Sequence, residues 1–481
     1  MTIAKPAGMV VLAILMLAQT SLARAAAQEG ATPRAPSPRA QISGSLLGGV
    51  PTGQVSPEPL ALSLKDAVDR ALRSNLGLRL QQESVRLAEG TRAVTQSDLR
   101  PNVSVRLAET FQQVNLAAFG FTGFPDVNIP TLVGPFSVFD ARVSVTQAIV
   151  DLSKQFDVRA DSATVRAETA TLKSTRGAAA LVAAGLYLQA VAAQSRIDAA
   201  RTQVETADAL YRLATDLKDA GIVAGIDVIR AQVQQQGQRQ RLISAQNAFE
   251  KLKLQLARAI GLPIGQTVVL TDKLPYAPLS APTLGAALAQ AYASRSDYQA
   301  LQARVDAAQA ERDSARSERL PSLRANADYG AIGPAPASVQ PTFAVSATVR
   351  VPVFEGGRQR AHLVESDARL RERQSELADF LARIDYEVRA ALLDLQAADQ
   401  QMQVTQAAMG LVNQELEQAR DRFSAGVASN VEVIQAQDAV ASAAEQYISS
   451  LYAHNLAKIA LAAARGDAEE LAAAFVGGSR P

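Results

Sequence analysis

The sequence predicts a mainly α-helical fold with a membrane β-sheet, built from two copies of one structural unit. Residues 64–101 align without a gap onto residues 284–321, and Phe139–Asp151 matches Phe343–Glu355 further along. Four shorter segments alternate apolar and polar residues with the period of a β-strand. We therefore expect an internally duplicated fold: a long α-helical coiled-coil barrel plus four β-strands per chain that contribute to a trimeric 12-stranded β-barrel.

Later landmarks extend the duplication and set the predicted domain boundaries. Ala220–Gln232 matches Ala425–Gln437, and Gly261 falls on Gly466. Similar landmarks in the same order over most of the chain indicate a repeat of one long unit. The predicted segments are a signal peptide (1–27), a Pro/Gly/Ser-rich leader (28–59), a first repeat (60–261), a linker (262–282), a second repeat (283–466) and a C-terminal tail (467–481).

The amino-terminal residues predict export. Lys5 precedes an apolar run from Met9 to Ala18, which small residues follow, as in a cleaved secretory signal. That run is shorter than the roughly 20 residues that a membrane-spanning helix requires. The leader is predicted to be flexible or extended, and we expect no transmembrane helix in the remaining sequence.

Each half contains signals for one helix before the strands and one very long helix after them. Ser63 suits an N-cap, and the helix that it begins is expected to continue to the stop at Pro101. The same signals bound residues 283–321. The long helices are expected over residues 153–218 and 357–423, each about 100 Å long. Such helices predict a rod or a coiled-coil wall.

The last helix carries a seven-residue repeat of larger side chains, with small residues three positions later. The larger residues are Val433, Val440, Tyr447, His454 and Leu461. This is the a/d seam of closely packed helices. His454 lies on the seam and His362 on the opposite long helix, so we expect both to have packing roles rather than metal or catalytic roles.

The alternating segments are residues 102–107, 139–146, 322–329 and 342–351. Their pattern fits either a soluble sheet with one wet face or a membrane barrel, and the predicted export favours the barrel. Four strands cannot close a barrel, because about eight form the smallest one. Eight strands from two chains would be filled by side chains, whereas twelve from three would leave a water-filled lumen. The loops 117–135 and 331–341 are expected to be mobile at the external mouth.

Composition argues against several classes of function. The chain has 48 Lys and Arg against 47 Asp and Glu, so it has no broad attraction for nucleic acid. It has no cysteine, which excludes disulfides, thiolate metal sites and thiol nucleophiles. No nucleophile elbow, phosphate loop or zinc-protease motif is present. We expect no catalytic, cofactor-binding or metal-binding residues, and no enzyme activity.

The junction between a strand and a long helix carries the motif Pro352, Phe354, Gly356 and Gly357. Proline ends a sheet ladder, and the glycines allow the backbone to turn into a helix. With this layout, residues 60–466 resemble the TolC-like outer-membrane efflux proteins.

A second motif is the helical hairpin tip, which occurs once in each half. Gly221 and Gly426 suit left-handed positions after a helix, and Asp227 and Asn430 suit the start of the next one. The resemblance implies that the tips form the periplasmic end of a tunnel and dock a periplasmic adaptor. The implied docking residues are Gly221, Ile222, Val223, Gly426, Val427 and Ala428.

The resemblance also implies a gate near these tips, at Asp227, Glu432, Gln435 and Phe423. Phe423 and Ala428 occupy positions where some relatives hold a tyrosine and an arginine that lock the closed state. Neither can form that hydrogen bond or salt bridge, so we expect a weaker lock and a less acidic constriction. Three copies of Glu432 would still focus a negative potential; alternatively, Glu432 is a solvated acid that the helix dipole favours.

The resemblance implies a homotrimeric exit duct in the outer membrane, with a helical extension into the periplasm. Its implied partners are outer-membrane lipid, a periplasmic adaptor protein and an inner-membrane transporter, and it would conduct substrates passively. The alternative is a periplasmic coiled-coil adaptor or structural protein. That alternative accounts for the heptads and tips but not for four alternating strands.

Overall fold

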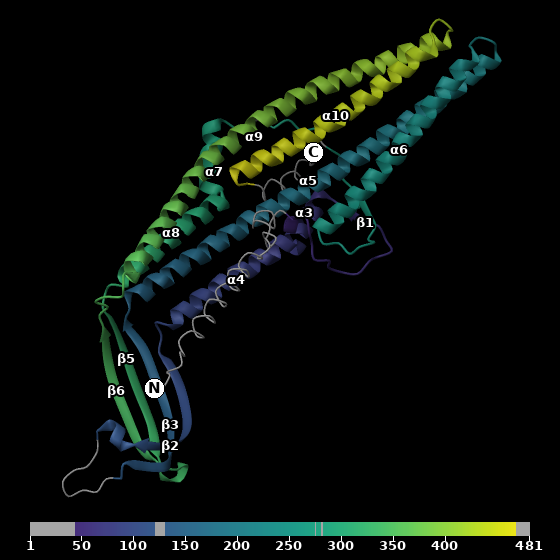
Figure 1. Cartoon of the computed structure of the whole chain (residues 1–481). Helices are drawn as coiled ribbons and strands as arrows, with labels where there is room; N and C mark the ends of the chain where they lie inside the picture. Colours follow the sequence, from purple (N-terminus) through teal and green to yellow (C-terminus); the bar gives the residue numbers. More distant parts are fainter. Residues whose placement is uncertain (1–43, 121–129, 275, 280–281, 468–481) are drawn as a thin grey trace, which may run out of the picture. The chain divides into compact units, whose positions relative to one another are not determined.

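Two very long helices, one in each half of the chain, run through the structure (Figure 1). The structure is a computed structural model that describes residues 44–120, 130–274, 276–279 and 282–467. Helix α5 (Leu152–Asp219) has 68 residues and α9 (Arg358–Ser424) has 67. At 1.5 Å per residue each is about 100 Å long, so the prediction of two very long helices is confirmed. The predicted signal peptide lies outside the described residues.

Shorter helices pack along the two long ones. In the helical half next to the sheet, the helices lie side by side in the order α4, α5, α8, α9. In the half that ends in the hairpin tips, α6 packs on α5 and α10 packs on α9. Helices α5 and α8 bury alanines at intervals of three and four residues, which allows their backbones to approach closely. The shorter helices are α3 (Leu64–Ser74), α4 (Leu76–Ser97), α6 (Gly225–Ala259), α7 (Leu284–Ser294), α8 (Ser296–Ser317) and α10 (Asn430–Arg465).

Each predicted helix ahead of the strands is broken once, a feature that the sequence pattern did not predict. The break between α3 and α4 lies at Asn75, whose ψ is 131°, and the break between α7 and α8 lies at Arg295, whose ψ is 113°. Asn75 accepts a hydrogen bond from Gly77 N at 2.9 Å and so begins a new helix with its own side chain. Arg295 makes no side-chain cap, so its break has no comparable signal in the sequence.

The end of the predicted leader packs against the first break, so it is not simply a flexible or extended segment. Val50 N donates to Ser74 O at 2.8 Å, and Leu76 N donates to Gly48 O at 2.9 Å. Leu46 is 7% exposed. The broken helix leaves backbone groups without intrahelical partners, and this segment satisfies two of them.

Four strands form one antiparallel sheet in the order β2-β3-β5-β6, at the end of the long helices opposite the hairpin tips (Figure 1). Among the described residues, β2 and β6 are its unpaired edges. A separate pair, β1 (Leu60–Leu62) and β4 (Val268–Leu270), is parallel. The four strands are β2 (Asn102–Asn115), β3 (Leu132–Val150), β5 (Ser322–Gly333) and β6 (Gln340–Arg350).

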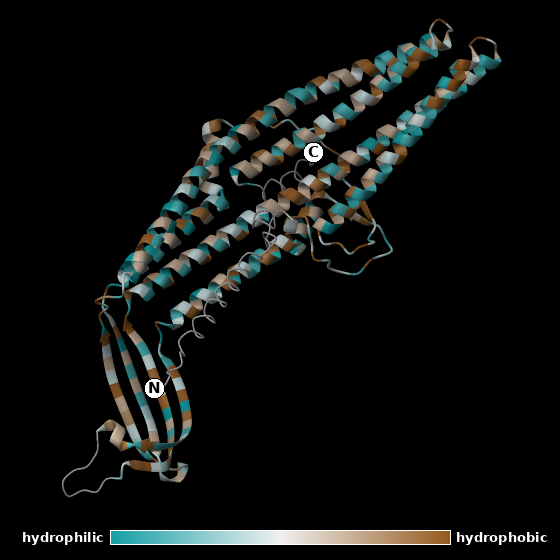
Figure 2. Ribbon diagram, in the orientation of Figure 1, coloured by the Kyte–Doolittle hydropathy of each residue, from teal (hydrophilic) through white to brown (hydrophobic). Residues whose placement is uncertain are grey.

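The strand register gives the sheet one apolar and one polar face. One cross-strand row contains Val103, Val145, Ala327 and Val345, and the adjacent row on the other face contains Asn102, Thr146, Asn326 and Ser346. Figure 2 shows the resulting alternation of brown and teal along the strands. The predicted period-2 pattern is therefore aligned across all four strands, because a slip of one residue would exchange the faces.

One described helix, α5, contains an 18-residue window long and apolar enough to cross a membrane. Of that window, 56% is buried inside the structure. A buried helix in a packed protein passes the same test, so this window is weak evidence for a membrane span.

Candidate functional site

The two hairpin tips lie together at one end of the structure. Gly221 and Gly426 follow α5 and α9 with φ of +73° and +71°, the left-handed conformation that glycine adopts without strain. A Cβ on Gly426 would lie 3.6 Å from Ile222 Cγ2, so the two turns are neighbours. Ile222 is 59% exposed and Val427 is 70% exposed. The tips therefore present apolar side chains to their surroundings, whereas Val223 and Ala428 are only partly exposed.

Phe423 does not line an opening within this chain. Its side chain is 1% exposed and packs in a cluster with Leu416, Val433 and Ala436. Asn430 also holds the tips together, because its Nδ2 donates to Asp227 O at 2.6 Å. It lies just inside α10 rather than capping it, and its side chain joins the second tip to the first.

The two acidic residues of the predicted gate have arginine partners in the same chain. Asp227 Oδ1 lies 3.3 Å from Arg230 Nη1, and Glu432 Oε1 lies 3.5 Å from Arg422 Nε. Gln435 is exposed one turn further along α10. Each carboxylate charge is thus offset by a neighbouring guanidinium group, which weakens any negative potential that these residues produce.

The junction between β6 and α9 is a charged turn with exposed apolar residues. Gly356 and Gly357 have φ of +60° and +84°, and Phe354 is 87% exposed. Pro352 lies two residues after the end of β6 and is partly exposed. Glu355 accepts hydrogen bonds from Arg358, which is the main cause of its lowered pKa.

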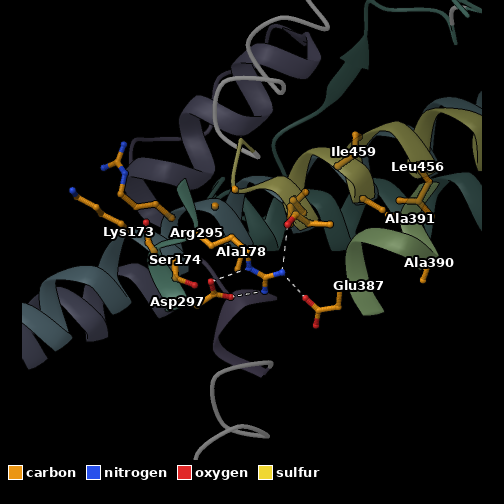
Figure 3. Close-up of a pocket in the computed structure, with 18 of the residues that line it drawn as sticks. Lys173, Ser174, Ala178, Arg295, Asp297, Glu387, Ala390, Ala391, Leu456 and Ile459 are labelled. Carbon is orange, nitrogen blue, oxygen red and sulfur yellow. Dashed lines mark hydrogen bonds and ion pairs between the residues drawn. The ribbon is translucent and has the colours of Figure 1, made fainter. Parts of the chain in front are cut away.

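A groove of about 970 Å³ lies midway along the long helices, where α10 ends against the start of α8 (Figure 3). Arg295, 7% exposed, is held between two acids: its Nη2 lies 2.8 Å from Asp297 Oδ2 and its Nη1 lies 2.7 Å from Glu387 Oε2. Nη1 also lies 3.4 Å from the carbonyl oxygen of Ala464, in the last turn of α10. Arg295 therefore links the start of α8 to the end of α10.

In the first half of the chain, a serine hydroxyl rather than an arginine links the corresponding two helix ends. Ser74 Oγ donates to Ile260 O at 2.7 Å, beside Gly261 at the end of α6. A Cβ on Gly261 would lie 2.5 Å from Ser74 Oγ, so only glycine fits. The sequence repeat contains Gly261 and Gly466, but it did not predict that these glycines allow the helix ends to approach each other closely.

Replacing Arg295 with methionine should destabilise the protein by about 2 kcal/mol, because it removes the charged hydrogen bonds of a buried guanidinium group. Asp297 loses its cation, whereas Glu387 keeps its ion pair with Arg383. The midpoint of urea unfolding, followed by circular dichroism, measures this loss. The matched control is Arg166→Met, which removes an exposed pair with Asp306 between α5 and α8 and should cost less than about 1 kcal/mol. Equal losses in the two variants would contradict the assigned role.

His454 is fully buried on the packed seam of α10, which confirms its predicted place. Its Nε2 lies 3.8 Å from Asp399 Oδ1, and neither ring nitrogen has a hydrogen-bond partner among the described residues. The ring also lies 5.3 Å from that of Tyr276. Burial and then the charge of Lys458 lower the pKa of His454, while Asp399 opposes this shift. His454 is therefore neutral in the folded protein at neutral pH.

Acidification should destabilise the protein through His454. The pKa of His454 is lower in the folded state than in the unfolded chain. As pH falls below about 6.5, the unfolded chain therefore binds a proton before the folded protein does. The free energy of unfolding then decreases by up to about 1.4 kcal/mol per pH unit. His454→Phe should remove this part of the decline in unfolding midpoint between pH 7.5 and 5.5. His362→Gln, which changes the other histidine, should retain it. An unchanged pH dependence in His454→Phe would refute the assignment.

In the part of the chain that the structure describes, no group of three or more His, Cys, Asp or Glu side chains could hold a metal ion. In the groove, Asp297 and Glu387 neutralise the charge of Arg295. What the fold offers instead is a sheet with one apolar face, continuous with long helices that end in apolar tips. These features define a subunit of a membrane channel with an α-helical extension.

The chain belongs to the outer membrane efflux protein family, whose model matches residues 67–262 and 287–467. The predicted resemblance to TolC-like proteins is thereby confirmed. The chain is an outer-membrane exit duct of an efflux system, a passive conduit rather than an enzyme. The alternative of a periplasmic coiled-coil protein does not fit this family.

Similar proteins agree with this assignment. The pyoverdine export outer membrane protein OpmQ of Pseudomonas aeruginosa is 24% identical over 420 residues, which cover 84% of this chain and 85% of that protein. OpmQ of Pseudomonas putida is 26% identical over 298 residues, or 59% of this chain and 60% of that protein.

Solved structures show the same fold. The outer-membrane channel OprN has a TM-score of 0.74 at 18% identity, with 84% of this chain and 90% of that chain covered. VceC of Vibrio cholerae has a TM-score of 0.72 at 17% identity, with 84% and 96% covered.

Proposed function

We propose that three copies of this chain form one continuous duct, with a 12-stranded barrel in the outer membrane and a helical tunnel in the periplasm. The observation that carries the proposal is the sheet, whose register aligns one polar and one apolar face while β2 and β6 remain unpaired edges. Pairing β2 of one copy with β6 of the next removes these edges. It also turns the apolar faces outward to lipid, as in membrane barrels.

Exposed apolar stripes on the outer helices support contacts between copies. Helix α4 exposes Leu80, Leu87 and Val94, which recur every seven residues as in a coiled-coil seam. Helix α9, at the other side of the row, exposes Val364 in its first turns beside the sheet, and Leu393, Val404 and Leu411 further toward the tips. Closure of the sheet brings α4 of one chain to α9 of the next. A second copy of the chain would therefore cover the exposed apolar residues of both outer helices.

An open, aqueous lumen requires three copies of the chain rather than two. Two copies would supply eight strands, and side chains fill a barrel of that size, whereas twelve strands leave an aqueous lumen. The polar face contains residues suited to such a lumen, including Asn102, Ser104, Thr146 and Asn326.

The hairpin tips are the proposed site for a periplasmic adaptor, through which an inner-membrane transporter delivers substrate. The exposure of Ile222 and Val427 supports this site, since neighbouring exposed apolar side chains mark protein contact surfaces. In the proposed gate, the pairing of Asp227 and Glu432 with arginines favours a constriction of low negative potential. The proposal also includes export of the chain through a signal peptide over residues 1–27. It retains the predicted division of the chain into two structural repeats.

The test is oligomeric state together with conductance. Protein extracted from outer membranes in detergent should have the mass of a trimer, and it should form ion-conducting channels in planar bilayers after mutation of the tip contacts. A monomer that needs no detergent, or a trimer that never conducts, would overturn the proposal.

A further inference from the structure

We propose that the barrel lumen favours anionic solutes, because arginines without acid partners line the polar face of the sheet. This inference rests on the proposed trimeric duct and adds a charge preference to it. The solute class is molecules with carboxylate, sulfonate or phosphate groups.

The strand register identifies the charges on the polar face. It carries Arg106 on β2, Asp140 and Arg142 on β3, Arg324 and Asp328 on β5, and Arg350 on β6. The remaining charged residue of these strands is Glu109, which pairs with Phe139 and so lies on the opposite face. The polar face therefore has more cationic than anionic side chains in every copy.

Ion pairing separates these arginines into two groups. Arg142 binds both Asp140 and Asp328, so both acids are already engaged. Arg350 Nη2 lies 3.4 Å from Glu355 Oε1. Among the described residues, neither Arg106 nor Arg324 has a carboxylate within ion-pair distance, and both are exposed.

Arg106 and Arg324 are spread along the sheet. Arg106 faces Arg142 directly across β2 and β3, which places like charges side by side. Arg324 lies opposite Thr348, six residues along β5 from the row of Arg106 and thus about 20 Å away. Two such arginines in each of three chains would give a positive potential over much of the barrel.

The lack of cysteine in the chain allows a direct test in the full-length protein. Ser346→Cys places one thiol on the polar face of β6, diagonally from Arg324, and Val345→Cys places one on the apolar face. Each is treated in outer membranes with an anionic sulfonatoethyl or a cationic trimethylammonioethyl methanethiosulfonate. The ratio of the two rates is divided by the ratio measured for free mercaptoethanol.

The thiol of Ser346→Cys should react about fivefold faster with the anionic reagent after this correction, from Coulomb attraction at about 8 Å in water. Adding Arg324→Gln should bring the ratio close to one, and Arg324→Lys should preserve it. Glu109→Gln, which removes a charge from the opposite face, should leave it unchanged. Raising the ionic strength should reduce the preference.

The outcomes separate this inference from the proposed duct. If Val345→Cys reacts as fast as Ser346→Cys, the barrel arrangement itself is wrong. If Ser346→Cys alone reacts but shows no preference for the anion, or if Arg324→Gln leaves the preference intact, the charge inference is overturned and the duct stands. A failure of Ser346→Cys to react at all would overturn the duct, and the charge inference with it, because the polar face would then not line water.

Discussion

Arginine in place of Val345 should prevent the protein from assembling in the outer membrane. Val345 lies in the apolar row of the sheet and is 76% exposed, so in the proposed barrel its side chain faces lipid. An arginine on the lipid face of a membrane barrel costs about 2–4 kcal/mol near the bilayer centre. Every chain of the trimer would carry this cost. The measurement is the fraction of membrane-extracted protein that migrates as a heat-sensitive oligomer on mild gels.

The adjacent residue supplies the control. Ser346→Arg places the same side chain on the same strand, but on the polar face, where water would solvate it. This variant should assemble at close to the wild-type level. If both variants assemble equally well, or if Ser346→Arg is the one that fails, the assignment of the two faces is incorrect.

Aspartate at both hairpin tips should uncouple the duct from its adaptor. In Ile222→Asp with Val427→Asp, exposed apolar side chains become charged ones that would have to be desolvated in the contact. Loss of a central apolar anchor typically costs at least about 2 kcal/mol, so the affinity for the adaptor should fall by at least about 30-fold. Co-purification of the cognate adaptor with the tagged duct, at a series of adaptor concentrations, measures this change.

Two further measurements show that the tip variant acts through the contact. Ile264→Asp changes an isoleucine that is 91% exposed and far along the chain from either tip, and it should leave the affinity unchanged. The tip variant itself should still form a conducting trimer. Full adaptor binding by an intact tip variant would rule out the tips as the docking site.

Some features could be read from local sequence because local physics sets them. Ser63 caps its helix through a hydrogen bond from Asp66 N at 3.2 Å, as its position before an apolar period predicts. Gly221 and Gly426 adopt positive φ after the long helices because other residues would be strained there. The strand faces were predicted correctly because side chains alternate strictly along a strand.

Other features depend on partners distant in sequence. The break at Arg295 has no local cap, and what stabilises it is the acid Glu387 on α9 and the end of α10. The family resemblance implied that Phe423 belongs to the gate, but within the chain it is buried by residues that include those of α9 and α10.

The sequence alone determined the duplication, the long helices, the alternating strands and the absence of catalytic motifs, because each is a pattern of neighbouring residues or of one segment against its repeat. Only the tertiary structure decided which helices adjoin, where the helix ends meet and which charges are neutralised. Arg142 and Arg324 look alike in their strands, yet Arg142 binds Asp328 across the sheet while Arg324 has no acid partner among the described residues. That difference depends on strand register, which sets distances between residues far apart in the chain.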